Sequence, residues 1–249
     1  MDPIGALNER LASAARVTVM SGAGISAASG VPTFRGAGGL WRTFRAEDLA
    51  TPEAFVRDPH LVWEWYGWRR TRIAECEPNP AHHVLAAWSR RDGFALVTQN
   101  VDGLHERAGT RDVIRFHGSI WELRCAAGCG APPWEDRRTP LPSLPHCRGC
   151  GGLARPAVTW FGEAIDRGVL TRCAAALACD VFLSVGTSSI VYPAAGLAHA
   201  ARDGGAFTVE INPTATDAAA ALDLAIAAPA EQVLPQLRWT GQAASGAAR

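Results

Sequence analysis

Short runs of β-branched and aliphatic residues alternate along the chain with longer segments in which apolar residues recur at helical spacing. The short runs predict buried parallel strands, and the longer segments predict the helices that cover them. Strands are expected at 17–20, 94–98, 113–116, 181–185, 206–211 and, more weakly, 224–227. Helices are expected at 3–15, 47–76, 79–91, 166–178, 193–203 and in a last segment ending near 237. This alternation predicts an α/β fold with a doubly wound, parallel, Rossmann-like sheet.

Polar clusters follow nearly every predicted strand. They are S-G-A-G-I-S at 21–26, Q-N-V-D-G at 99–103, H-G-S at 117–119, G-T-S-S at 186–189 and E-I-N at 210–212. Ligands of open parallel sheets bind outside the carboxyl ends of the strands. The pattern therefore predicts one composite site that all these clusters share.

Composition narrows the function classes. The 249 residues are 48% hydrophobic and 19% charged, which is typical of a globular chain with one α/β body and a modest insertion. With 24 basic and 24 acidic residues the net charge is zero, so we expect neither nucleic acid nor an anionic membrane as a partner. No apolar run reaches the roughly 20 residues of a membrane span, and the N-terminus shows no signal-peptide pattern.

Four of the seven cysteines form two close pairs. Cys125 and Cys129 are separated by three residues, Cys147 and Cys150 by two, and 17 residues lie between the pairs. Two such pairs suit tetrahedral zinc, and a closed four-thiolate site predicts a structural ion, one per chain. His146 beside Cys147 is an alternative ligand. The pattern favours a metal site in a reducing cytoplasm over a disulfide framework.

The first polar cluster contains a glycine motif. Residues 22–27 match G-x-G-x-x-A after a strand, where glycines let the backbone approach a pyrophosphate, although a plain tight turn is the alternative. A dehydrogenase would show a second strand ending in an acidic residue about 20 residues later. The segment at 31–41 has no such strand, which indicates chemistry other than hydride transfer.

The later clusters supply acid–base and hydrogen-bonding groups. His117 is a candidate general base, and Gln99, Asn100 and Asp102 are candidate positioning partners. A hydrogen-bonded loop histidine is the alternative reading of His117. The G-T-S-S and E-I-N segments suit ribose hydroxyls and an adenine, with helix capping as their alternative.

Taken in order, these motifs resemble a known family. The chain carries G-A-G-I-S, G-V-P-T-F-R-G, T-Q-N-V-D-G-L-H, F-H-G-S, the two cysteine pairs, R-P-x-V-x-W-F-G-E, G-T-S-S-I-V-Y-P and E-I-N. This order resembles the sirtuins, NAD-dependent protein-lysine deacylases, over about 17–237. The first cysteine pair is one residue longer than the family's usual C-x2-C, which bears on the zinc geometry. T-F-R replaces the D-F-R of many sirtuins, and T-F-R-G-A-G-G-x-W resembles the class III branch.

That branch implies a preference for acidic acyl groups. Its signature is a Tyr-x-x-Arg pair that reads a carboxylate, and Tyr66 and Arg69 match it. Residues three apart share one face of a helix, so both side chains can hold one anion. Ala50 matches the small residue that widens the acyl pocket. An amphipathic helix with a surface arginine is the alternative.

The resemblance also implies the roles of the remaining site residues. His117 acts as general base on the ribose hydroxyls, Asn100 and Asp102 position the ribose and the nicotinamide, and lysine and O-acyl-ADP-ribose are released. The implied NAD-binding residues are Gly22, Ala23, Gly24, Phe34, Arg35, Gln99, Asn100, Asp102, Gly186, Thr187, Ser188, Asn212 and Ala227. The implied residues for an acyl-lysine peptide, which pairs as an added strand, are Ala50, Tyr66, Arg69, Val158, Trp160, Phe161, Gly162, Glu163, Val191 and Tyr192.

The positions of the predicted elements and motifs also suggest how the chain divides into domains. We expect an NAD-binding domain at 1–33, 81–119 and 159–238, a helical insertion at 34–80, a zinc module at 120–158 and a disordered tail at 239–249. A monomer is favoured.

The alternatives to a deacylase that prefers acidic acyl groups are a plain deacetylase, a mono-ADP-ribosyltransferase and a non-catalytic NAD or ADP-ribose sensor. His117 and Asn100 argue against the sensor, which needs no base beside the ribose.

Overall fold

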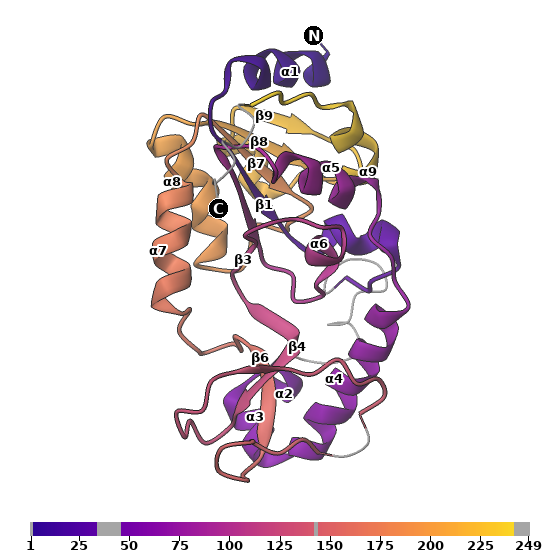
Figure 1. The fold of residues 1–249 in the computed structure, drawn as a ribbon. Coiled ribbons are helices and arrows are strands. Elements are labelled where there is room, and N and C mark those ends of the chain that lie inside the picture. Colours follow the sequence, from indigo (N-terminus) through magenta and orange to yellow (C-terminus); the bar gives the residue numbers. More distant parts are fainter. Residues whose placement is uncertain (1, 34–45, 142–143, 242–249) are drawn as a thin grey trace, which may run out of the picture.

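A parallel six-stranded sheet forms the larger of two bodies in the computed structural model, which describes residues 2–33, 46–141 and 144–241 (Figure 1). From edge to edge the strands are β3 (Ile114–Arg115), β2 (Phe94–Thr98), β1 (Val17–Ser21), β7 (Val181–Val185), β8 (Phe207–Ile211) and β9 (Leu224–Ile226). The chain builds outward from β1 in one direction and from β7 in the other. A switch point therefore lies between β1 and β7, where such sheets bind ligands. The α/β, Rossmann-like prediction is confirmed.

Helices cover both faces of this sheet, which is why its central strands are buried throughout and mostly apolar. All five residues of β1 and all five of β7 are buried. On one face, α1 (Pro3–Ser13), α5 (Pro80–Trp88) and α9 (Ala230–Val233) pack on Val17, Val19 and their neighbours. On the other face, α7 (Arg167–Ala176) and α8 (Leu197–Asp203) pack on Met20 and Phe182.

The smaller body contains an antiparallel sheet and three helices. The sheet order is β5 (Trp134–Glu135), β4 (Gly118–Cys125) and β6 (Ala154–Val158). The helices are α2 (Ala46–Leu49), α3 (Pro52–Arg57) and α4 (Pro59–Ala74), and Figure 1 shows them beside β4 and β6. One hydrophobic cluster joins Leu49 and Trp63 from the helices to Ile120 and Leu123 from the sheet. Residues 46–80 and the described part of 120–158 thus share a core.

Proline divides the predicted 47–76 helix into three. Pro52 and Pro59 each begin a new helix, and the preceding Thr51 and Asp58 cap it by accepting hydrogen bonds from Ala54 N and Leu61 N. Proline lacks the N–H that a helix interior needs but fits the first turn. The prediction of helix was right, but its continuity was wrong.

A buried ion pair ties α4 to the segment after β5. Arg70 on α4 is fully buried, its Nη2 lies 3.1 Å from Asp136 Oδ1, and its guanidinium carbon lies 5.4 Å from the centre of the Trp121 ring. Removing one partner of such a pair leaves a buried charge without compensation. The pair therefore fixes the rotation of α4 relative to the three-stranded sheet.

One further expectation needs correction, and the glycine motif has a local structure of its own. After Gly22, the motif lies in a 3-10 helix, η1 (Ala23–Ser29). The predicted disordered tail begins too early, because Trp239 is 3% exposed and its Nε1 donates to Ala14 O at 2.9 Å.

The short elements that complete the fold are α6 (Leu104–Arg107), η3 (Ala194–Gly196), η4 (Asp217–Ala221) and η5 (Leu234–Gln236). Among the described residues, no helix is long and apolar enough to cross a membrane.

Candidate active site

A cavity of about 560 Å³ lies at the carboxyl ends of β1, β2, β7 and β8 and extends to α4 of the smaller body. It brings together most residues singled out from the sequence: Gly22, Ala23, Gly24, Ala50, Tyr66, Arg69, Gln99, Asn100, His117, Val158, Trp160, Phe161, Gly162, Glu163, Gly186, Thr187, Ser188, Val191, Tyr192 and Asn212. Asp102 is buried and Ala227 is exposed, and neither residue lines the cavity. Phe34 and Arg35 lie outside the described residues.

The glycines after β1 and β7 let two loops touch. A Cβ on Gly24 would lie 2.7 Å from the Gly186 Cα, and one on Gly22 would lie 2.8 Å from the Thr187 Cα. Gly186 has a φ of +61°, which also favours glycine. Gly24 N donates to Gly186 O at 2.7 Å. The motif thus closes the sheet's switch point into one continuous wall.

Asn100 and Asp102 belong to a buried hydrogen-bond network. Asn100 Nδ2 donates to Gly22 O at 3.1 Å and to Ser26 Oγ at 3.2 Å. Ser26 Oγ in turn donates to Asp102 Oδ2 at 2.8 Å, and Leu104 N donates to Oδ1 at 2.9 Å. Burial raises the pKa of Asp102 despite these bonds. Asp102 therefore acts on the cavity through Ser26 and Asn100, as a positioning residue.

His117 has the tautomer and protonation state of a general base. Its Nδ1 lies 3.1 Å from Gln99 O, and a carbonyl only accepts, so Nδ1 carries the proton. The lone pair is then on Nε2. Burial lowers the pKa of His117, which keeps the ring neutral near pH 7. Because His117 lines the cavity, it can take a proton from a ligand hydroxyl there.

The other end of the cavity presents an aromatic and cationic wall. Tyr66 and Arg69 lie one turn apart on α4 and are only 2% and 6% exposed. The Arg69 guanidinium carbon lies 4.8 Å from the centre of the Trp65 ring. Burial lowers the pKa of Arg69, and the nearby Tyr66 and Asp102 act in the opposite direction. A cation buried at this cost is a natural partner for an anionic ligand group.

Glu163 lies in an ion-pair cluster at the same wall. Its carboxylate accepts from Arg155 Nη1 and Nη2 at 2.7 and 2.6 Å and from Arg124 Nη2 at 3.0 Å. It also accepts from Trp160 N at 2.9 Å. These contacts lower the pKa of Glu163 against the opposing effect of burial. The main effect of the Glu163 carboxylate is therefore to hold Arg155, Arg124 and the Trp160 backbone in position.

Several lining residues were missed by sequence reasoning. They are Ala27, Thr33, Trp65, Val101, Thr159, Ile165, Pro193, Pro213 and Thr214. Most are direct neighbours of singled-out residues, so their positions in the motifs were the available signal. Nothing in the sequence singles out Trp65, because the spacing of aromatic residues does not show which of them face a cavity.

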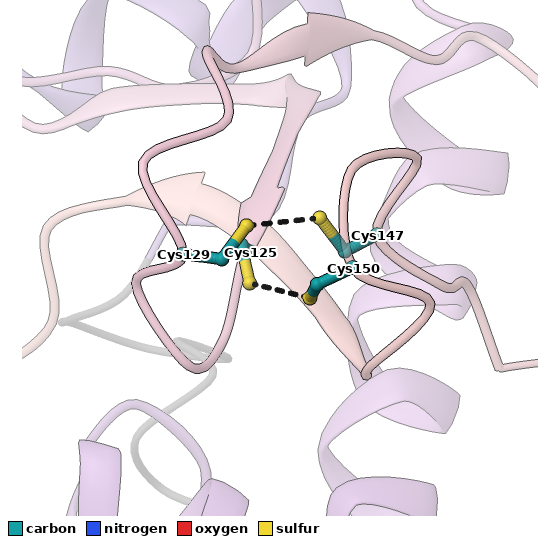
Figure 2. A group of neighbouring side chains, drawn as sticks. All are labelled: Cys125, Cys129, Cys147 and Cys150. Atoms are coloured by element: carbon teal, nitrogen blue, oxygen red, sulfur yellow. Dashed lines mark hydrogen bonds between the residues drawn. The ribbon is translucent and has the colours of Figure 1, made fainter.

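The four cysteines form a cluster in the smaller body, and Figure 2 shows the two pairs facing each other. Cys125 Sγ lies 3.6 Å from Cys150 Sγ, and Cys129 Sγ lies 3.6 Å from Cys147 Sγ. Tetrahedral zinc with Zn–S bonds of about 2.3 Å needs S–S separations of roughly 3.8 Å, so the cluster fits that ion. His146 Nδ1 donates to Gly151 O at 2.9 Å, so this nitrogen carries a proton and is no metal ligand. The four sulfurs alone complete the set. Among the described lining residues of the cavity there is no cysteine, which suits a structural ion.

The chemistry of the cavity also fits a dinucleotide. Its volume lies within the range of about 300–1,000 Å³ that is usual for ligand sites. Hydroxyls and amides from three strand ends face it, namely Gln99, Asn100, Thr187, Ser188 and Asn212. Such groups hydrogen-bond ribose hydroxyls and phosphate oxygens. The residues present therefore suit NAD.

Comparison with known proteins agrees with this geometry. The model of the Sir2 family matches residues 22–193. A protein from Aquifex aeolicus named NAD-dependent protein deacylase is 51% identical over 203 residues, covering 80% of this chain and 84% of the relative. NAD-dependent protein deacylase 1 from Pseudomonas aeruginosa is 47% identical over 244 residues, covering 93% of this chain and 96% of the relative.

Solved structures show the same fold. A complex of a Sir2 homolog with NAD matches with a TM-score of 0.86 and 42% identity, covering 92% of this chain and 90% of that one. Sir2Af2 bound to a myristoylated histone peptide matches with a TM-score of 0.76 and 32% identity, covering 94% of both chains. These proteins carry a dinucleotide and an acylated peptide on the fold described here.

Proposed function

This chain belongs to the Sir2 family, and we propose that it is an NAD-dependent protein-lysine deacylase with a preference for acyl groups that end in a carboxylate, namely succinyl, malonyl and glutaryl. The observation that carries the preference is the pair Tyr66 and Arg69, which line the same cavity as His117. One cavity thus offers a general base and an anion-binding pair. The names of the relatives support the deacylase activity, and the cavity wall supports the acyl preference.

In this proposal the strand-end residues bind NAD and control one proton. NAD, when bound, supplies a ribose carbon with nicotinamide as its leaving group. Asn100 is held by Gly22 O and Ser26 Oγ, so its amide is a fixed partner for the ribose and nicotinamide end. His117 accepts a ribose hydroxyl proton at Nε2, while Gln99 O keeps Nδ1 protonated.

The residues at the acyl end of the cavity offset the cost of removing a carboxylate from water. An unpaired carboxylate is costly to remove from water, whereas a charge-assisted hydrogen bond contributes about 1.5–3 kcal/mol. Arg69 supplies the charge, Tyr66 a hydroxyl, and the small Ala50 side chain leaves space beside them. An acetyl group presents a methyl there and gains nothing from the pair.

The rim of the cavity suits a peptide. Phe161 and Tyr192 line it and are 42% and 74% exposed, which leaves apolar surface for the chain that carries the acyl-lysine. Val158 lies at the end of β6, an edge strand of the small sheet. An extended peptide can add to such an edge by backbone hydrogen bonds. Proteins or peptides with acylated lysines are therefore the proposed substrates.

The test is a panel of one peptide carrying acetyl-, malonyl-, succinyl- or glutaryl-lysine, with nicotinamide release as the readout. We expect kcat/KM for the acidic acyl groups to exceed that for acetyl by at least about tenfold, which corresponds to about 1.4 kcal/mol. Arg69→Met should lower the succinyl-to-acetyl ratio by about that factor. Arg72→Met is the matched control, because Arg72 is exposed on the same helix and pairs with Glu75.

A wild-type preference for acetyl would leave a plain deacetylase and end the acidic-acyl proposal. An equal loss for both substrates in Arg69→Met would assign Arg69 to the structure of α4 instead. Analysis of the products distinguishes a mono-ADP-ribosyltransferase from a deacylase. Transfer to a protein acceptor would leave ADP-ribose on the protein rather than in O-acyl-ADP-ribose.

A further inference from the structure

Trp160 and Tyr66 make a hydrogen bond whose direction is fixed. Trp160 Nε1 lies 2.8 Å from Tyr66 Oη, and an indole N–H can donate but not accept. The phenol oxygen must therefore accept this bond, and its own proton points elsewhere. Within the described part of the chain the Tyr66 hydroxyl donates to no protein acceptor, and Tyr66 lines the cavity. The hydroxyl is thus a donor kept for a ligand.

We propose that Trp160 is a specificity-determining positioning residue that turns the Tyr66 hydroxyl proton toward the terminal carboxylate of the acyl group. The inference rests on the proposed acidic-acyl preference and adds a residue to it. A carboxylate only accepts hydrogen bonds, so a hydroxyl already set as a donor needs no reorientation to bind it. A hydroxyl free to rotate would lose part of that advantage.

Trp160 is itself held on its backbone and on its ring face. Its backbone N–H donates to Glu163 Oε2 at 2.9 Å. The Arg155 guanidinium carbon lies 3.5 Å from the centre of the indole ring, and Glu163 fixes that guanidinium through two hydrogen bonds. The Phe55 ring lies 5.5 Å away, between centroids. These contacts fix the orientation of the indole ring, so that its N–H points at the Tyr66 hydroxyl oxygen.

Burial adds to the effect of this contact. Trp160 and Tyr66 are 3% and 2% exposed, so water does not compete for the hydroxyl at this bond. Burial also raises the pKa of Tyr66, which keeps the phenol protonated at neutral pH and preserves its donor. The Trp160–Tyr66 pair thus works as a unit beside Arg69, which supplies the charge.

A double-mutant cycle tests this unit. Trp160→Phe, Tyr66→Phe and the double variant are compared through the ratio of kcat/KM for succinyl- and acetyl-lysine on one peptide. The ratio cancels losses common to both substrates. We expect it to fall about fivefold in Trp160→Phe and about tenfold in Tyr66→Phe, with no further loss in the double variant, because the indole acts through the phenol. The loss should appear mainly in KM for succinyl-lysine.

Trp63→Phe is the matched control. Trp63 lies in the same core, is 5% exposed, and donates from Nε1 to Ala154 O at 2.9 Å, so the variant loses an equivalent bond. Trp63 is absent from the described lining of the cavity, and its replacement should leave the ratio unchanged. An equal fall in Trp63→Phe would reduce the effect to core stability and overturn the proposal.

A second measurement does not need the Trp160 variant to fold. Among the nine tryptophan indole N–H resonances, one should move strongly in Tyr66→Phe, which keeps the ring and removes the acceptor. The same resonance should respond to succinyl-lysine peptide more than to acetyl-lysine peptide. If no indole resonance moves, or if losses in the cycle simply add, the inference is wrong. Absence of succinyl preference in the wild type would instead overturn the proposed function.

Discussion

At the scale of single residues, the chemistry of His117 depends on a neighbour that the sequence does not reveal. The histidine was singled out because it follows a predicted strand. Its tautomer comes from Gln99, whose carbonyl lies 3.1 Å from Nδ1 because β3 pairs beside β2. Motif reading could find the imidazole but not the partner, since the pairing joins residues 18 positions apart. The same limit applies to Trp160 and Tyr66, which are 94 positions apart.

His117 should produce the acid limb of the pH–rate profile. The base works when neutral, and burial lowers the pKa of His117 below its ordinary 6.5. We therefore expect kcat/KM to rise with pH through a midpoint below 6.5 and then level off. His117→Ala should lose about 10²–10⁴-fold in turnover and should lose this limb, while ADP-ribose still binds. Near-wild-type turnover in the variant would remove His117 from the mechanism.

At the scale of elements, the strands were predictable and the breaks between helices were less so. Each central strand is a short, mostly apolar run because both faces of the sheet are covered, so its position is visible in the sequence. Pro52 and Pro59 are visible in the sequence as possible helix starts, but the prediction of one helix over 47–76 rests on the spacing of apolar residues, which does not show the breaks. The burial of Trp239 was not predictable, because its partner Ala14 belongs to the other end of the chain.

Two helices beneath the cavity meet through a pair of histidines. His82 on α5 and His105 on α6 are buried, with ring centroids 4.9 Å apart. His105 Nε2 lies 2.8 Å from Ser21 Oγ, and His82 Nε2 lies 3.4 Å from Ser26 Oγ. Burial lowers the pKa of each to about 3, with His105 adding to the effect on His82. Both rings are therefore neutral in the folded protein.

This pair should make the fold sensitive to acid. Below pH 6.5 the unfolded chain binds protons at both imidazoles and the folded chain does not, so stability is present above that pH and lost as pH falls. Between pH 7 and 5.5 the two sites together should lower the free energy of unfolding by roughly 2.5 kcal/mol. Denaturant unfolding at both pH values measures it.

The control for this prediction replaces a histidine on the surface. His105→Gln, which keeps a donor for Ser21, should reduce the acid-induced loss by about half of that amount. His60→Gln at an exposed position should leave the loss as it is in the wild type. The explanation would be contradicted if the two variants showed the same pH dependence.

At the scale of the whole molecule, the site is assembled from two bodies. The larger body supplies the strand ends that suit NAD, and the smaller supplies Tyr66, Arg69 and Trp160. The smaller body is itself built from segments far apart in sequence, which share one hydrophobic cluster and the Arg70–Asp136 ion pair. The cysteine cluster lies on the sheet of this body, at the end of β4. A metal ion held there would therefore support α4 through a common core.

Removing that ion should destabilise the smaller body rather than produce a clean catalytic defect. We expect one zinc per chain in the wild type and none in the double variant Cys147→Ser with Cys150→Ser, measured by metal analysis. Zinc held by four thiolates contributes folding free energy, so the variant should melt early or aggregate. Cys179→Ser is the control, because Cys179 lies buried in the larger body and should not change the metal content.

The same loss of zinc should reach Tyr66 and Arg69, the proposed acyl-binding pair, through the shared core. Partial removal of zinc by a chelator should lower the succinyl-to-acetyl ratio before ADP-ribose binding declines, because α4 packs on the small sheet whereas the strand ends belong to the larger body. Peptide turnover and ADP-ribose binding measured on one chelated sample give both quantities. A metal-free preparation that remains fully stable and equally selective would show that the cysteine cluster has no structural role in this enzyme.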